Sequence, residues 1–225
     1  MYLYFLDKIT QDSQTLWEKT KSKYEVKCRI LIESFSSYIL ASGRKNLHER
    51  ELVATLVLES LSHICTILPI DYPRGVIKDE FGKPYFDDTS LGFSISHNED
   101  MVLVAYEKEG AVGADVESEI PCVKTEKISA RFPAIASLKT EISNEEIEAF
   151  LMDENGNFKP ITLSSADDDF TAKWTAAEAI MKCDGRGFST ISDLDRLQKE
   201  MMILTKTVHF GDKKVYVSCA KKSNK

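Results

Sequence analysis

The stretch FTAKWTAAEAIMKCDGRG, Phe170–Gly187, decides the fold around it because it has the pattern of a single buried helix. Apolar residues recur in it at steps of four, three and four, which places them on one helix face: Phe170, Trp174, Ala177 and Met181. The acidic run Asp167–Asp169 favours a helix start just before it. Gly185 favours a left-handed helix stop. The sequence therefore predicts one helix with an apolar stripe.

A charged pair lies beside this stripe. Glu178 and Lys182 are four residues apart, so both side chains project from one side of the helix. Taken alone, such a pair is most often a solvated ion pair. It gains meaning beside three other segments of the chain: GKP at Gly82–Pro84, SISHN at Ser94–Asn98 and VGADVE at Val112–Glu117.

These four segments, in this order, resemble the signature of the surfactin-type 4′-phosphopantetheinyl transferases. That signature runs GKP, a strand with Ser-His, G-x-D-x-E, and then F-x-x-x-W-x-x-K-E-A-x-x-K. The resemblance spans roughly Arg44 to Phe188. Each motif alone is common by chance, whereas four in order form a specific combination. The chain departs from the pattern at Ala177, where the family has a lysine.

Composition limits the function independently of any motif. The chain has 225 residues, of which 43% are hydrophobic and 29% charged, so it can form a core and an ordinary solvated surface. Its formal charge of −7 argues against a protein that binds nucleic acid through bulk positive charge. The five cysteines form no C-x-x-C pair, so neither a zinc site nor a disulfide framework is indicated.

Localisation follows from the same features. Free thiols fit a reducing cytoplasm. The apolar start Met1–Leu6 is followed at once by Asp7 and Lys8, which makes it too short for a signal core and predicts a first strand. No run of apolar residues is long enough to cross a membrane. We therefore expect a cytoplasmic protein without a membrane or nucleic-acid partner, and we expect a monomer.

The remaining pattern predicts an α+β fold, because helix-rich stretches alternate with antiparallel hairpins. The predicted strands and hairpins are Tyr2–Leu6, Phe93–Ser96 with Met101–Tyr106, Ala111–Val116, and Met201–Phe210 with Lys214–Cys219. The predicted helices are residues 13–40, a helix opened by an Asn46/Glu49 capping box, Lys124–Ala136, and Ser143–Met152 with a Ser143/Glu146 capping box. A loop is expected at Asp153–Ser165.

The resemblance adds a domain organisation that periodicity does not provide. It implies two similar α/β halves related by pseudo-twofold symmetry, with the active site between them and a junction near Tyr106–Gly110. Residues 1–108 would form the N-terminal half and carry the coenzyme A phosphate and nucleotide contacts. Residues 109–225 would form the C-terminal half and carry the metal ligands and the signature helix.

The acidic residues suggest a metal site. Asp115 and Glu117 are two apart in a predicted strand and so face the same way. If Glu178 approaches from the helix, three carboxylates converge, and without a cation their repulsion would raise their pKa values. An all-oxygen ligand set suits Mg²⁺, which also bridges phosphates. The alternative is an exposed strand face beside a turn, and the resemblance favours the metal.

The resemblance also implies a set of coenzyme A contacts. Basic residues near the second helix, the GKP bend and the Ser-His strand end would meet the phosphates and nucleotide, together with the helix lysine: Lys45, Arg50, Lys83, Pro84, Ser96, His97 and Lys182. The alternative for Lys45 and Arg50 is a solvated basic turn. The alternative for His97 is an exposed side chain, which is more common for a lone histidine at a turn. Arg131-Phe132 matches a family pair that docks the acceptor, with ordinary packing of Phe132 as the alternative.

The activity implied by the resemblance is transfer of the phosphopantetheine arm of coenzyme A to a serine of an acyl or peptidyl carrier protein. Asp115, Glu117 and Glu178 would hold Mg²⁺, and Lys182 would touch the phosphates. Glu178 or a metal-bound water would accept the proton of the serine hydroxyl. Ala177 removes one cation, for which Arg186 or Lys173 could substitute, or Ala177 is simply packed on the apolar stripe.

Two alternatives stay open at this level. The first is a degenerate family member that binds coenzyme A or a carrier protein without efficient transfer, which Ala177 favours. The second is an unrelated Mg²⁺-dependent phosphohydrolase with the same carboxylates. The hydrolase would release phosphate without a carrier, whereas the transferase would add a phosphopantetheine mass to a serine.

Overall fold

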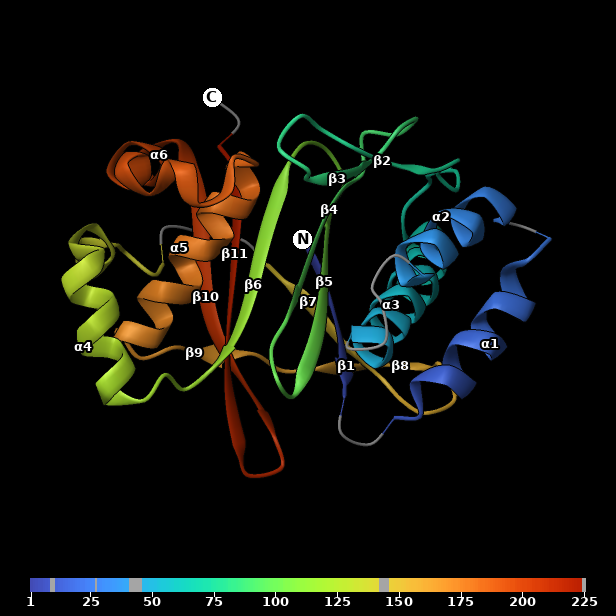
Figure 1. Ribbon diagram of the computed structural model, residues 1–225, viewed down its shortest axis with the longest axis horizontal. Coiled ribbons are helices and arrows are strands. Elements are labelled where there is room, and N and C mark those ends of the chain that lie inside the picture. Colours follow the sequence, from blue (N-terminus) through green and yellow to red (C-terminus); the bar gives the residue numbers. More distant parts are fainter. Residues whose placement is uncertain (9–10, 27, 41–45, 142–145, 224–225) are drawn as a thin grey trace.

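The computed structural model describes residues 1–8, 11–26, 28–40, 46–141 and 146–223, and it has the mixed α+β architecture that the sequence predicts. Two groups of helices lie at opposite ends of the molecule with the strands between them (Figure 1). The helices are α1 (Ser13–Tyr24), α2 (Arg29–Leu40), α3 (Leu47–Ile67), α4 (Cys122–Arg131), α5 (Phe170–Asp184) and α6 (Leu194–Glu200), with 3₁₀ turns η2 (Pro133–Ser137) and η3 (Gly187–Asp193). Among the described residues, none of the helices combines the length and the apolar character needed to cross a membrane.

The strands of the described ranges form three sheets. A five-stranded sheet has the order β4-β5-β1-β7-β8, a four-stranded sheet has the order β6-β11-β10-β9, and β2 pairs with β3 alone. Their bounds are β1 (Tyr2–Asp7), β2 (Val76–Lys78), β3 (Pro84–Phe86), β4 (Gly92–His97), β5 (Met101–Glu107), β6 (Val112–Ser118), β7 (Glu148–Met152), β8 (Phe158–Ile161), β9 (Ser164–Ser165), β10 (Met201–Phe210) and β11 (Lys213–Lys222).

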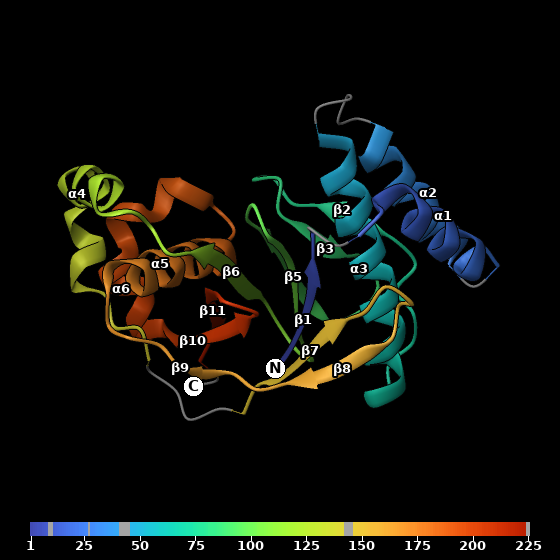
Figure 2. The same cartoon turned by 90° about the horizontal axis from the view of Figure 1, so that it is seen from below.

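The two larger sheets pack face to face, with helices on their outer faces. Alternate residues of β1 and β5 point to opposite sides of the sheet, because side chains alternate along a strand. Tyr4 and Leu6 pack against α1, α2 and α3, whereas Leu3 and Phe5 pack against the four-stranded sheet. The outer face of that second sheet carries α5 and α6. The layers therefore run helices, sheet, sheet, helices (Figure 2).

Most predicted elements are confirmed with small shifts of their ends. The first strand, both predicted hairpins and the strand after Gly110 all form. The signature helix is α5, whose N-cap Asp169 accepts a hydrogen bond from the backbone N–H of Ala172. Gly185 ends it in the left-handed conformation, with φ of 95°. The predicted helix over residues 13–40 is instead two helices, α1 and α2, and that over Lys124–Ala136 is α4 followed by η2.

The Asn46/Glu49 capping box was a wrong prediction. Asn46 does precede α3, but its side chain makes no capping hydrogen bond. The Glu49 carboxylate is drawn instead to two basic groups, and its Oε2 lies 2.6 Å from Lys8 Nζ and 3.2 Å from His97 Nδ1. The ion pairs with Lys8 and His97 are stronger interactions for the Glu49 carboxylate than a capping hydrogen bond to the backbone at Asn46.

The helix predicted over Ser143–Met152 was also wrong. Its C-terminal part is strand β7, which runs parallel to β1, with Tyr2 opposite Glu148. Pairing with a buried central strand overrides a helical pattern in so short a segment. Ser143, and with it the predicted cap, lies outside the described residues. The predicted loop Asp153–Ser165 contains β8 and β9.

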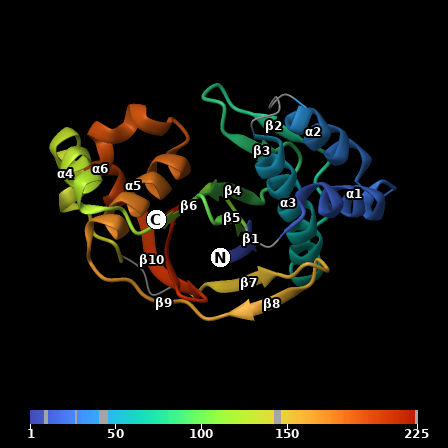
Figure 3. The ribbon, with the colours of Figure 1, turned by 60° about the horizontal axis from the view of Figure 1, so that its bottom comes forward.

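The β7–β8 hairpin lies in the sequence of the predicted C-terminal half, residues 109–225, but pairs with a strand of the predicted N-terminal half. It follows the expected junction near Tyr106–Gly110, yet it belongs to the sheet of β1. Figure 3 shows both strands reaching from the side of β9 toward α1 and α3. Lys19 of α1 donates to the backbone carbonyl of Asn155 in the hairpin turn, over 3.4 Å.

Candidate functional site

Strand β6 places two acids on the face that meets α5. Val112, Ala114 and Val116 point into the core between the sheets, so the alternate residues Asp115 and Glu117 point to the helix side. Gly113 shares this second face and permits close packing. A Cβ there would lie 2.0 Å from the carbonyl oxygen of Ala179 in α5. The G-x-D-x-E spacing thus combines a close helix–strand contact with two carboxylates aimed at the helix.

Helix α5 adds the third carboxylate. One carboxylate oxygen each of Asp115, Glu117 and Glu178 lies within 4.8 Å of the others. Asp115 is buried, and the two glutamates are half-buried. The predicted convergence of these three acids is therefore present.

Lys182 and Ser96 complete the polar group around Asp115. Lys182 Nζ donates to Asp115 Oδ1 over 2.6 Å and to Ser96 Oγ over 2.8 Å. Ser96 Oγ in turn donates to Asp115 Oδ1 over 2.7 Å and accepts from the backbone N–H of Val116 over 3.3 Å. Two residues earlier in β4, Ser94 Oγ accepts a hydrogen bond from the backbone N–H of Ala114. Serines of β4 thereby link the edges of the two sheets beside the carboxylates.

The electrostatics of the cluster favour a cation. Burial, followed by the negative charge of Asp115, raises the pKa of Glu117 to about 7. The same two causes raise the pKa of Glu178 well above its usual value. Lys182 opposes both shifts but does not cancel them. One lysine is therefore too little positive charge for three neighbouring carboxylates.

The burial of one Asp115 oxygen also favours a cation at this cluster. Asp115 Oδ2 is buried and has no hydrogen-bond partner in the described part of the chain. A carboxylate oxygen in that position ordinarily costs free energy unless a ligand satisfies it. The donor set consists of oxygens alone, which suits a hard divalent cation such as Mg²⁺. Asp115, Glu117 and Glu178 are thus residues that could hold a metal ion.

The cluster forms part of the wall of a cavity of about 680 Å³. The cavity extends from the carboxylates, across β4 and the β2–β3 hairpin, to α2 and α3. Its apolar part includes Phe35, Tyr38, Val53 and Phe93. Five of the residues predicted to contact coenzyme A line it: Lys83, Pro84, Ser96, His97 and Lys182. Its volume and mixed lining are typical of a small-molecule site.

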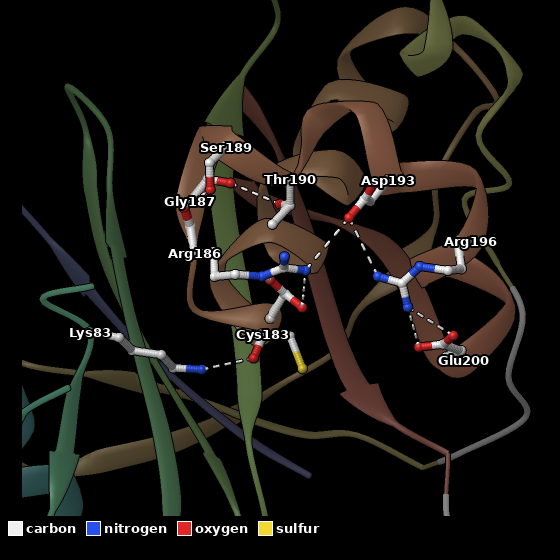
Figure 4. Close-up of polar contacts among 10 residues, drawn as sticks. Lys83, Cys183, Arg186, Gly187, Ser189, Thr190, Asp193, Arg196 and Glu200 are labelled. Atoms are coloured by element: carbon white, nitrogen blue, oxygen red, sulfur yellow. Dashed lines mark hydrogen bonds and ion pairs between the residues drawn. The ribbon is translucent and has the colours of Figure 1, made fainter. Parts of the chain in front are cut away.

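Lys83 reaches across to the end of α5. Its Nζ donates to the carbonyl of Cys183 over 3.1 Å, as Figure 4 shows, and to the carbonyl of Val112 over 3.2 Å. Burial is the main cause that lowers its pKa. The GKP bend is thereby fastened to α5 and β6, and Gly82 has the positive φ of 87° that the turn requires.

The other predicted cations also have partners. His97 lies beside Glu49, and burial lowers its pKa. Arg50 does not line the cavity; it donates to the backbone carbonyl of Tyr38 over 2.6 Å and stacks on the Tyr38 ring, which does. Lys45 lies outside the described residues.

Neither proposed substitute for the missing family lysine lines the cavity. Arg186 donates to both carboxylate oxygens of Asp184 and pairs with Asp193, which also pairs with Arg196 (Figure 4). This chain of ion pairs holds η3 against the end of α5. Lys173 pairs with Asp168. Ala177 itself is fully buried in the core under α5, which agrees with packing on the apolar stripe.

The sequence analysis did not predict the apolar wall of the cavity, and it missed one of its described cations, Lys78. Lys78 of β2 is exposed and lines the cavity, and in the β2–β3 hairpin it lies directly opposite Pro84. The short strand VIK before the GKP bend was the available signal, since an antiparallel partner places a side chain next to Pro84.

No protein-family model matches this chain, and no curated protein matches it significantly.

Proposed function

We propose that this protein is a 4′-phosphopantetheinyl transferase, which moves the phosphopantetheine arm of coenzyme A to a serine of a folded acyl or peptidyl carrier protein. The observation that carries the proposal is the convergence of Asp115, Glu117 and Glu178 at one wall of a large cavity beside Lys182. The order of the four sequence motifs supports it as well.

The cavity suits the proposed substrate in its chemistry. Coenzyme A combines an aromatic base with several phosphates and a long arm. The apolar wall formed by Phe35, Tyr38 and Phe93 suits the base, and the cationic side chains suit the phosphates. The position of both kinds of group in one cavity favours a nucleotide-like ligand over a purely apolar one.

The three carboxylates would hold Mg²⁺, with Asp115 Oδ2 as a ligand that has no competing hydrogen bond from a described residue. When bound, Mg²⁺ would supply positive charge to the phosphate oxygens as negative charge develops on them. The protein's own part is to keep these oxygens together. Gly113 brings α5 close enough for Glu178 to face Asp115 and Glu117.

The reaction itself makes and breaks one bond to phosphorus. The serine oxygen of the carrier attacks the phosphorus that bears the pantetheine arm, the bridging P–O bond breaks, and 3′,5′-ADP leaves. Glu178 accepts the serine proton with one carboxylate oxygen. Lys182 is fixed by Ser96 and Asp115 and offers its ammonium to the transferred phosphoryl group.

The layered fold is consistent with the proposed pair of similar halves. Each large sheet carries helices on its outer face, and the cluster lies where β4 of one sheet meets β6 of the other. A pseudo-twofold relation between residues 1–108 and 109–225 is part of the proposal. The exchange of the β7–β8 hairpin into the first sheet would be a departure from strict symmetry.

Product analysis tests the proposal against its nearest rivals. The protein is incubated with coenzyme A and Mg²⁺, with and without an apo-carrier protein, and the nucleotide products are separated. We expect 3′,5′-ADP to form only when the carrier is present. Inorganic phosphate released without a carrier would favour the phosphohydrolase, and coenzyme A binding without any product on several carriers would favour a binding-only protein.

A further inference from the structure

Within the described part of the chain, Lys78 differs from the other cations of the cavity wall because its ammonium has no bound partner. Its side chain is exposed at the end of β2, and no hydrogen bond or ion pair of its ammonium occurs among the described residues. By contrast, Lys182 is held by Asp115 and Ser96, and Lys83 is held by two backbone carbonyls. Lys78 is the described lysine of this wall whose three ammonium N–H groups are all available to a ligand.

The hairpin that carries Lys78 is held in place. Asp79 Oδ1 accepts the backbone N–H groups of Phe81 and Lys83, which closes the turn after β2. The Asp79 side chain also lies close to Gly185 at the end of α5. Lys78 therefore projects from a fixed position beside Pro84, and its own neighbour Asp79 is occupied by the turn.

The proposed substrate has one anionic group that the carboxylate cluster does not account for. If the pyrophosphate reacts beside Glu178 and Lys182, the 3′-phosphate of coenzyme A must lie farther along the cavity with the ribose and the base. A phosphomonoester carries close to two negative charges at neutral pH, since its second pKa is about 6. It requires a cation of its own.

We propose that Lys78 binds the 3′-phosphate of coenzyme A and so makes the cavity selective for coenzyme A over its 3′-dephospho form. This inference rests on the proposed function, because it places the reacting pyrophosphate at the carboxylates. A lysine suits this task as a mobile point charge at the rim, where the phosphate stays partly solvated. Lys78 is a specificity residue and takes no part in the bond changes.

The test measures the binding of two ligands by calorimetry in Mg²⁺-containing buffer: coenzyme A and 3′-dephospho-coenzyme A. Lys78→Ala is compared with the wild type, with Lys78→Arg, and with Lys199→Ala. The last variant removes the same charge from an exposed position on α6 that does not line the cavity. Melting curves confirm that each variant is folded.

We expect Lys78→Ala to weaken coenzyme A binding about tenfold and to leave dephospho-coenzyme A within about twofold of the wild type. Lys78→Arg and Lys199→Ala should bind both ligands like the wild type. Unchanged coenzyme A affinity in Lys78→Ala, or an equal loss for both ligands, would overturn the inference and leave the proposed function standing. A wild type that binds neither ligand would overturn the proposed function and this inference with it.

Discussion

Gly113→Ala is the substitution that tests most sharply how the fold builds the site. The added Cβ would lie 2.0 Å from the carbonyl oxygen of Ala179, 2.3 Å from the backbone nitrogen of Cys183 and 2.9 Å from its Cα. These are backbone atoms of α5, so no side chain can rotate away. Since real Cβ contacts do not occur below 3.0 Å, α5 and β6 must separate by at least 1.0 Å, the difference between 3.0 and 2.0 Å.

This separation has two measurable consequences. Overpacking of this kind costs about 3 kcal/mol. For a chain of this size, the melting temperature should therefore fall by about 6–12 °C. The same shift moves Glu178 and Lys182 away from Asp115, and a misplacement of about 1 Å can reduce a reaction rate about 100-fold. We therefore expect transfer to fall by more than the loss of folded protein explains.

Gly75→Ala is the matched control. Its Cβ would lie 3.7 Å from Asp87 Oδ2 and from a side-chain carbon of Ile30, which is ordinary contact distance. Its melting temperature should stay within about 2 °C of the wild type. Differential scanning calorimetry of both variants is the assay. Equal melting temperatures for Gly113→Ala and Gly75→Ala would refute the close packing of α5 on β6.

Three further predictions concern the charges of the site. Asp115→Asn should abolish transfer and remove the stabilisation by Mg²⁺, which at ten times the dissociation constant is about 1.4 kcal/mol in the wild type, as melting curves with and without Mg²⁺ will show. Ala177→Lys should lower stability by about 3 kcal/mol or more in urea unfolding and should not raise activity, because the position is fully buried in the core; a faster, equally stable variant would contradict this. Without metal, the free energy of unfolding should fall as pH rises from about 4.5 through 7. Burial raises the pKa of Glu117 to about 7 and also raises the pKa of Glu178. Over this range the folded state therefore binds protons that the unfolded state has lost. Urea midpoints across this range measure the fall, and Mg²⁺ should reduce it at the upper end. A rise instead would show that the pKa values of these two carboxyl groups are not raised in the folded state.

The sequence pattern predicted those helices and strands that are determined by residues close to them in the chain. The caps of α5 at Asp169 and Gly185 and the two hairpins depend on residues close in the chain. Strand β7 depends instead on its pairing with β1, more than 140 residues away. No local pattern distinguishes such a strand from a short helix.

The same limit applies to the candidate site. The strand period placed Asp115 and Glu117 on one face, and the helix period placed Glu178 beside Lys182, so their convergence could be predicted once the motifs were read together. The engagement of Lys83 with the end of α5 could not, because it joins segments 100 residues apart. The exposed partner of Pro84, Lys78, followed only from the register of a hairpin that the sequence reasoning did not recognise.

The mass of an apo-carrier protein after incubation with coenzyme A, Mg²⁺ and this protein shows directly whether the phosphopantetheine arm is transferred. We expect a gain equal to one phosphopantetheine group, confined by peptide mapping to a single serine, and no gain with Asp115→Asn in place of the wild type. A carrier whose mass stays unchanged with the wild type, across several carriers and with coenzyme A binding demonstrated, would contradict the assignment of these carboxylates to phosphopantetheine transfer.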